Sequence, residues 1–160
     1  MADDNLQQAV TNLIRLETRC LDDADLDTWA SLFTEDGYYW MPLEREQTDP
    51  EQHDSLVYDN RALMEMRNYN LHNPLSPSMQ REVRSVRILS DLETDLPADP
   101  GGEITATASV IAVIHHRKQD TYAGTVTWRL VQTGEGLQIK SKRVDLLNAD
   151  APLDSIMMYI

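Results

Sequence analysis

The sequence contains one cysteine, one phenylalanine and no long hydrophobic run. Cys20 has no second cysteine for an internal disulfide, and a Rieske cluster needs two cysteine and two histidine ligands. No apolar stretch approaches the roughly 20 residues that a membrane helix requires. The acidic and polar residues 1–8 lack the features of a signal or transit peptide. We therefore expect a cytoplasmic protein with no membrane segment, no disulfide and no iron–sulfur cluster of its own.

Positive charge is also scarce. Lysine and arginine number 14 against 27 aspartates and glutamates, which gives a formal net charge of −13 at pH 7. Binding to a phosphate backbone needs a basic surface that displaces counterions. The nearest approach to one is Lys140, Lys142 and Arg143, on a predicted strand beside Asp145. We expect neither nucleic acid nor an anionic membrane surface as a partner.

The first half of the chain has mainly helical patterning, and its 160 residues suffice for one domain over 1–160 with its own core. Apolar residues recur at three- and four-residue steps in the opening segment, as on one face of a helix. Aromatic residues before Pro42 are typical of a strand, and Pro42 favours a strand end. The predicted order is a helix over 3–23, a short helix capped by Asp25 or Asp27 and ended by 35–37, a strand over 37–43, a long polar loop over 44–57 and a helix over 58–71.

The second half has the patterning of long strands separated by turn residues. The predicted strands are 82–92, 103–118, 121–132 and 137–148. The alternation slips near residues 141–143 and between Val83 and Val86, which predicts bulges and a strongly curved sheet. Residues 110–114 are apolar on both faces, so we expect both faces to be covered there. The fold class is therefore α+β, with N-terminal helices packed on a strongly curved antiparallel sheet to form a cone with an apolar pocket.

The tail over 152–160 (PLDSIMMYI) is apolar and follows the last predicted strand. An exposed patch of this kind is unusual on a monomer. We expect the tail to be buried against another chain.

The four histidines do not form a metal-binding pattern. His115 and His116 are adjacent on a predicted strand, so their side chains point to opposite faces. Neither His53 nor His72 has an HExxH motif or a similar metal-ligand spacing near it. Solvated or core histidines are favoured over a metal site or catalysis, and we predict no metal site.

Two groups of residues have both a structural and a functional interpretation. The aromatic residues fill a core or interface, or they line a ligand pocket. The carboxylates are Glu17, on the apolar stripe of the first helix, and Asp59. They are either structural groups paired with Arg61 or Arg81, or general acid–base groups. No Ser-His-Asp order, phosphate loop or dinucleotide motif is present. The aromatic residues concerned are Tyr38, Tyr39, Trp40, Tyr58 and Trp128.

Several ordered segments carry a resemblance to a known family. They are Leu16–Asp22 (LETRCLD), Tyr38–Pro42 (YYWMP), Gln47–Pro50 (QTDP), Ser55–Leu56, Tyr58–Arg61 (YDNR) and Arg81–Val86. In this order they resemble the small (beta) subunit of bacterial aromatic-ring-hydroxylating dioxygenases, in the benzoate and toluate dioxygenase branch. The resemblance covers essentially the whole chain.

This resemblance implies a cone-shaped fold like that of nuclear transport factor 2. It also implies a catalytic alpha subunit as partner, which carries the Rieske cluster, the mononuclear iron and the substrate site. The chain itself would hold no cofactor. It would self-associate as a trimer within a hetero-hexamer and assemble the alpha subunits for dihydroxylation in aromatic compound catabolism. The chain would thus be a non-catalytic part of an oxidoreductase complex.

Under this hypothesis no residue is catalytic, and the expected subunit contacts are Trp40, Asp49, Pro50, Ile156, Met157, Tyr159 and Ile160. The alternative is a stand-alone dehydratase or isomerase of the same fold, with pocket residues Glu17, Tyr38, Tyr58 and Asp59. A third hypothesis is a small-ligand binding module. An open cavity with an inward carboxylate or histidine would favour the stand-alone enzyme.

Overall fold

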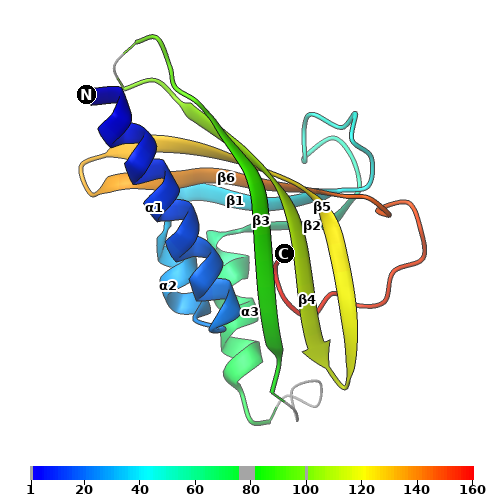
Figure 1. The fold of residues 1–160 in the computed structure, drawn as a ribbon. Coiled ribbons are helices and arrows are strands. Elements are labelled where there is room, and N and C mark those ends of the chain that lie inside the picture. The colour runs from blue at the N-terminus through cyan, green and yellow to red at the C-terminus, as the bar shows by residue number, and fades with distance from the viewer. Residues whose placement is uncertain (1, 76–81, 100) are drawn as a thin grey trace.

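The computed structural model describes residues 2–75, 82–99 and 101–160. Three helices lie against a six-stranded sheet that curves around them (Figure 1). The elements are α1 (Ala2–Asp22), α2 (Leu26–Ser31), β1 (Phe33–Pro42), β2 (Ser55–Asn60), α3 (Arg61–His72), β3 (Arg84–Asp95), β4 (Ile104–His116), β5 (Lys118–Thr133) and β6 (Gly136–Leu146). The predicted α+β class is confirmed. No helix in the described ranges is both long and apolar enough to cross a membrane.

Helix α1 follows the predicted boundaries to within one residue. Its apolar stripe buries Val10, Ile14 and Leu21 against the sheet, because these side chains recur on one face. Asp3 and Asp4 lie in the first turn, where the helix dipole favours negative charge. The stripe also carries Glu17 inward, which places one carboxylate in the core.

The boundary between α2 and β1 differs from the prediction. Helix α2 ends at Ser31 and β1 begins at Phe33, so residues 33–36 are strand rather than helix. Phe33 is fully buried and pairs with Ile139 of β6, and this tertiary contact outweighs the local helical pattern. Gly37 lies where the register shifts, and a Cβ there would come within 2.9 Å of the Thr34 carbonyl oxygen.

The predicted loop over 44–57 and helix over 58–71 are also corrected. Residues 55–60 form β2, which pairs antiparallel with β1, and α3 begins only at Arg61. Asn60 caps α3, because its side chain accepts a hydrogen bond of 3.0 Å from the Leu63 backbone amide. The edge strand therefore takes residues 55–57 from the predicted loop and residues 58–60 from the predicted helix.

The sheet order is β2-β1-β6-β5-β4-β3, and β1 runs parallel to β6. The predicted antiparallel meander is therefore correct for β3 to β6, and β1 and β2 extend it into a mixed sheet. The predicted irregularity in β6 is present, one residue before the predicted range of 141–143. Ile139 and Ser141 pair with successive residues of β5, so Lys140 between them has no partner in the register. The register shift in β3 lies between Ser90 and Glu93. The bulge predicted between Val83 and Val86 is wrong, because Val83 precedes the strand.

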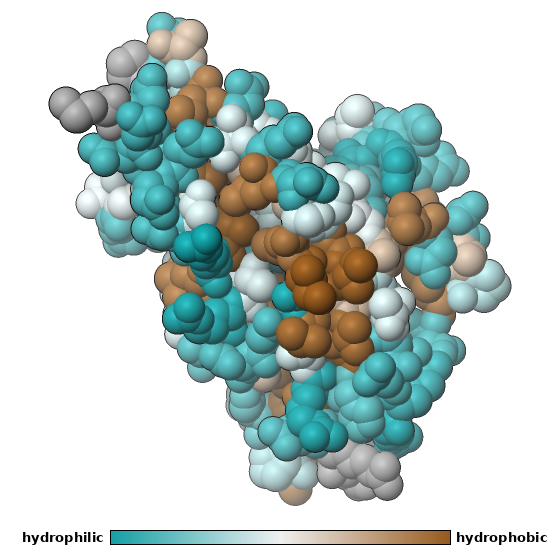
Figure 2. Space-filling view, viewed as in Figure 1, coloured by the Kyte–Doolittle hydropathy of each residue, from teal (hydrophilic) through white to brown (hydrophobic). Residues whose placement is uncertain are grey.

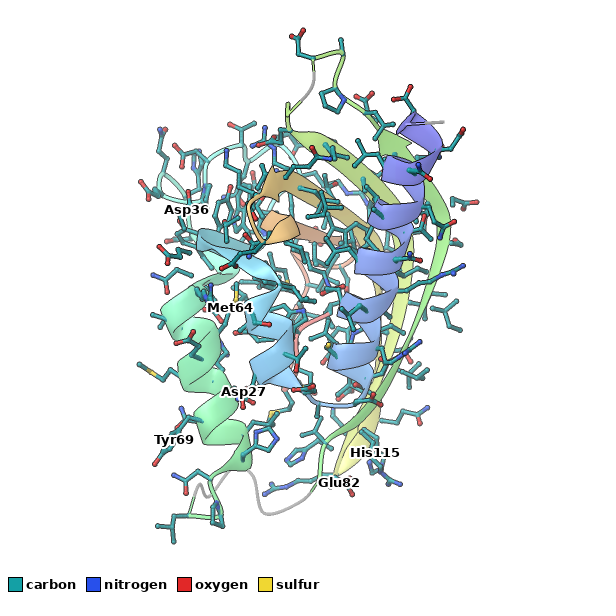
Figure 3. All side chains as sticks on the ribbon, turned by 90° about the vertical axis from the view of Figure 1, so that its left-hand side faces the viewer. Asp27, Asp36, Met64, Tyr69, Glu82 and His115 are labelled. Carbon is teal, nitrogen blue, oxygen red and sulfur yellow. The ribbon has the colours of Figure 1, made fainter. Side chains whose placement is uncertain are left out.

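The helices cover only the concave face of the sheet, as the view turned by 90° makes clear (Figure 3). Helix α1 contacts β3 and β6, and α2 packs between α1 and α3. In Figure 3 Tyr69 points away from α3 into solvent, and it is 70% exposed. The concave face is therefore the one that a cone-shaped fold would offer to a ligand.

Candidate functional site

The centre of the concave face holds a buried ion pair. Lys142 of β6 donates a hydrogen bond of 2.6 Å to Glu17 Oε1, which also accepts a 2.6 Å bond from Trp29 Nε1. Glu17 is 1% exposed and Lys142 is 2% exposed. Burial lowers the pKa of Lys142, and the negative charge of Glu17 opposes this shift. The pair is a structural contact closed off from solvent.

A second inward carboxylate, Asp59, lies at the end of β2. Arg67 Nε of α3 and the Tyr159 hydroxyl both donate hydrogen bonds to Asp59 Oδ2, the latter at 2.7 Å. Burial, and then the bond to Asp59, raise the pKa of Tyr159, so its phenol stays protonated. Asp59 thus joins an edge strand, a helix and the C-terminal tail.

The end of the tail lies inside the cone. Tyr159 stacks on Trp29 with ring centroids 4.4 Å apart, and its carbonyl oxygen accepts a hydrogen bond from Arg87 Nη2. The Ile160 amide donates a 3.2 Å bond to the Tyr39 hydroxyl. The three last residues, Met158, Tyr159 and Ile160, are buried by their own chain. We expected the tail to be buried against another chain, whereas these three residues are buried in the chain's own core and residues 152–157 are not buried.

The four pocket residues of the stand-alone hypothesis do not lie together. Glu17 and Asp59 point into the core, where both are paired. Tyr38 and Tyr58 flank each other edge to face, with centroids 5.6 Å apart, and neither is in the buried core. Strand alternation explains this, because Tyr39 is the inward residue of β1 at this point. The partners also differ from those predicted: Lys142 pairs with Glu17 and Arg67 with Asp59, while Arg81 lies outside the described residues.

The buried phenols predict a loss of stability at alkaline pH. Burial raises the pKa of both Tyr39 and Tyr159, so the unfolded state releases these protons at lower pH than the folded state. Their stabilisation is complete below the unfolded pKa of about 10 and falls above it by about 1.4 kcal/mol per pH unit for each tyrosine. The lowered pKa of Lys142 acts oppositely, but only up to about pH 10.4, where the unfolded lysine loses its proton.

This pH dependence is measured by urea unfolding between about pH 10.5 and 12. Tyr159→Phe is expected to make the decline of unfolding free energy with pH shallower. The exposed Tyr69→Phe is the matched control and should leave the slope unchanged. An equal slope in all three proteins would contradict the assignment.

The polar loop over 43–54 is held against the opposite, convex side of the sheet by Arg143. Its Nη1 and Nη2 groups donate to the carbonyl oxygens of Gln47 and Arg45, and it also pairs with Asp145. The guanidinium lies 4.6 Å from the centroid of the Trp40 ring. Trp40 is only 3% exposed, so it supports this loop from below.

Asp49 and Pro50 lie in the same loop and are partly exposed. Asp49 accepts hydrogen bonds from the Glu51 amide (2.9 Å) and from Gln52 Nε2 (2.8 Å). Its carboxylate therefore shapes the turn that presents Pro50. The loop is an ordered acidic surface, and subunit contact through it stays a prediction.

An apolar patch on the convex face went unpredicted as a contact surface. Val86 and Ile88 of β3 and Ile111 of β4 are 52%, 63% and 48% exposed, and Ile88 pairs directly with Ile111. Figure 2 shows brown side chains gathered over these two strands. The expectation that residues 110–114 are covered on both faces is wrong for this chain alone. The doubly apolar pattern was nevertheless the sequence signal for this patch.

The described residues do not fit a Rieske cluster or a mononuclear iron site. Cys20 is buried in α1, and burial raises the pKa of its thiol, which disfavours the thiolate that binds metal. Within the described ranges, no group of three or more histidine, cysteine, aspartate or glutamate side chains could hold a metal ion.

Comparison with known proteins identifies the family. The family model described as "Ring hydroxylating beta subunit" matches residues 16–151. The toluate 1,2-dioxygenase subunit beta of Pseudomonas putida is 27% identical over 146 residues, covering 88% of this chain and 90% of that protein. The 2-halobenzoate 1,2-dioxygenase small subunit of Burkholderia cepacia is 28% identical over 145 residues, covering 87% of each.

The solved structures show the same fold. The beta subunit of benzoate 1,2-dioxygenase from Burkholderia mallei superimposes with a TM-score of 0.71 at 23% identity, over 94% of this chain and 95% of that one. This likeness confirms the expected cone-shaped α+β fold, and the family match confirms the resemblance found in the sequence. The chain belongs to the beta subunits of the ring-hydroxylating dioxygenases, which are oxidoreductase complexes.

Proposed function

We propose that this chain is a non-catalytic structural subunit, folded as one domain over residues 1–160, that assembles catalytic alpha subunits of a Rieske-type dioxygenase. The observation that carries the proposal is the interior of the cone. The chain's own C-terminus occupies it, and both inward carboxylates, Glu17 and Asp59, are bound by cationic partners. A general acid or base must reach its substrate, and these two groups are closed off. The stand-alone dehydratase or isomerase is therefore the weaker hypothesis.

In this proposal the Rieske cluster, the mononuclear iron and the substrate site belong to the alpha subunit. Three beta chains associate as a trimer within a cytoplasmic hetero-hexamer. The complex dihydroxylates an aromatic ring in catabolism. The names of the two curated relatives, which refer to toluate and 2-halobenzoate, favour an aromatic acid as its substrate.

The proposed contact surfaces are those that the single chain leaves accessible. The acidic loop over 43–54 presents Asp49 and Pro50, with Trp40 beneath it. Ile156 and Met157 are partly exposed on the tail, directly before the residues that enter the cone. The patch of Val86, Ile88 and Ile111 adds apolar area of the kind that oligomers bury. Tyr159 and Ile160 act indirectly, by fixing the tail that carries Met157.

Assembly is tested by replacing Met157 with aspartate. A charge at an apolar contact is expected to shift the chain, alone and with its large subunit, toward smaller species by size-exclusion chromatography and native mass spectrometry, since an uncompensated buried charge costs several kcal/mol. Met66→Asp on α3 is the matched control, because Met66 is 58% exposed and lies outside the proposed contacts. If Met157→Asp assembled like the native chain, the proposed role of the tail in subunit contact would be contradicted.

A further inference from the structure

A cavity of about 320 Å³ remains between α3 and the C-terminal tail. Its floor is apolar and is made by Tyr39 and Met41 of β1 and Val57 of β2. The tail residues 155–159 form one wall, and α3 forms the other. Small-molecule sites commonly begin at about 300 Å³, so this space suits a ligand with one ring.

The α3 wall brings polar groups to this apolar space. Arg67, Asn70 and Leu71 occupy positions i, i+3 and i+4, so they share one face of the helix. Arg67 uses Nε and Nη2 on Asp59, and its guanidinium carbon lies 5.8 Å from the centroid of the Tyr159 ring. Among the described residues, neither Arg67 Nη1 nor the Asn70 side-chain amide has a hydrogen-bond partner. Both donors remain available to a ligand.

Among the described residues, the lining of this cavity includes no acidic side chain, and the charge of its one cation is balanced by Asp59 outside the lining. The cation is Arg67, and the chain as a whole carries a net charge of −13. Asp59 holds Arg67 from outside the lining and so fixes the direction of the guanidinium. A positioned guanidinium with free N–H groups prefers a planar carboxylate.

We propose that this cavity binds a small aromatic carboxylic acid. The ring lies against Met41, Val57 and Leu71, and the carboxylate accepts hydrogen bonds from Arg67 and Asn70. No bond is made or broken in the ligand. The site is separate from the substrate site that we place on the alpha subunit, and this chain alone supplies its described lining.

Ligand binding in this cavity is expected to change the NMR signals of the tail. Because residues 155–159 line the cavity and Tyr159 stacks on Trp29, a bound acid is expected to alter the tail signals. The test titrates the full-length chain with benzoate, followed by amide chemical shifts and by calorimetry. Benzamide is the neutral analogue of the same shape, and acetate is the carboxylate without a ring.

The geometry predicts saturable shifts for residues 155–159 with benzoate, and at least about tenfold weaker binding of benzamide and acetate, because each lacks one of the two recognised features. Arg67→Lys keeps a cation for Asp59 but removes the planar guanidinium, and it should weaken the binding of benzoate by about tenfold. Arg61→Lys is the matched control on the same helix, outside the cavity lining.

Three results would overturn the site: no saturable shift with benzoate, equal affinity for benzamide, or equal weakening by Arg61→Lys and Arg67→Lys. Far-ultraviolet circular dichroism of each variant establishes that it is folded. Because the titration uses this chain alone, its failure leaves the proposed assembly role unchanged.

Discussion

Replacing Lys142 with methionine is expected to lower the free energy of unfolding by about 3–5 kcal/mol. Lys142 is the cationic partner of Glu17, and both side chains are almost completely buried. Without the ammonium group, the Glu17 carboxylate keeps only the Trp29 N–H as a hydrogen-bond donor. Its second oxygen already has no partner among the described residues. Urea unfolding at pH 7 measures the loss.

The double variant Glu17→Leu/Lys142→Met separates pairing from packing. Removing both charges removes the uncompensated carboxylate, so the double variant should be more stable than Lys142→Met by several kcal/mol. Lys140→Met is the matched control, since Lys140 is exposed on the same strand, and should change stability by no more than about 0.5 kcal/mol. A double variant no more stable than the single one would show that packing of the lysine stem dominates.

Replacing Tyr159 with alanine is expected to cost about 3–5 kcal/mol, as for other large aromatic residues removed from a core. Tyr159 is 6% exposed, and its ring packs on Trp29 and Tyr39, with the Tyr39 centroid 4.8 Å away. The change also removes the hydroxyl that donates to Asp59. Loss of the stacked ring beside Trp29 should shift the tryptophan emission to longer wavelength, because water enters the cone.

Tyr159→Phe isolates the hydroxyl from the ring. This variant retains the stacking and loses one hydrogen bond to a charged group, which is worth about 1.5–3 kcal/mol. Tyr69→Ala, on the exposed face of α3, is the control and should stay within about 0.5 kcal/mol of the native chain. If Tyr159→Ala were as stable as Tyr69→Ala, the tail would not belong to the core.

The sequence was most informative where local pattern and tertiary contact agree. Helix α1 and the strands β3 to β6 have clear periodicity, and they lie close to their predicted positions. The predictions failed at residues 33–36 and 55–60, where pairing with β6 and β1 overrides a local pattern that also fits helix or loop. The pairing of Phe33 with Ile139 joins residues more than 100 positions apart, and a single sequence contains no signal for it. The β1–β2 pairing is closer in sequence, as Pro42 with Ser55 shows, but it lies across a long polar loop that gave no hairpin signal.

The site was predicted in a similarly uneven way. Glu17 was identified because a carboxylate on an apolar stripe must be paired or face a cavity, and it is paired. Its partner, Lys142, is nearly as far away in sequence as the chain allows, so the spacing of residues could not identify it. Burial of the apolar tail is found for Met158, Tyr159 and Ile160, and it is in the chain's own core; composition could not distinguish this core from that of another chain.

Iron content and ring dihydroxylation, measured for the purified chain and for the chain with its large subunit, test the structural role most directly. We predict that the chain alone contains no stoichiometric iron and converts no aromatic substrate, whereas the complex does both. Turnover of an aromatic compound by the isolated chain would contradict the account.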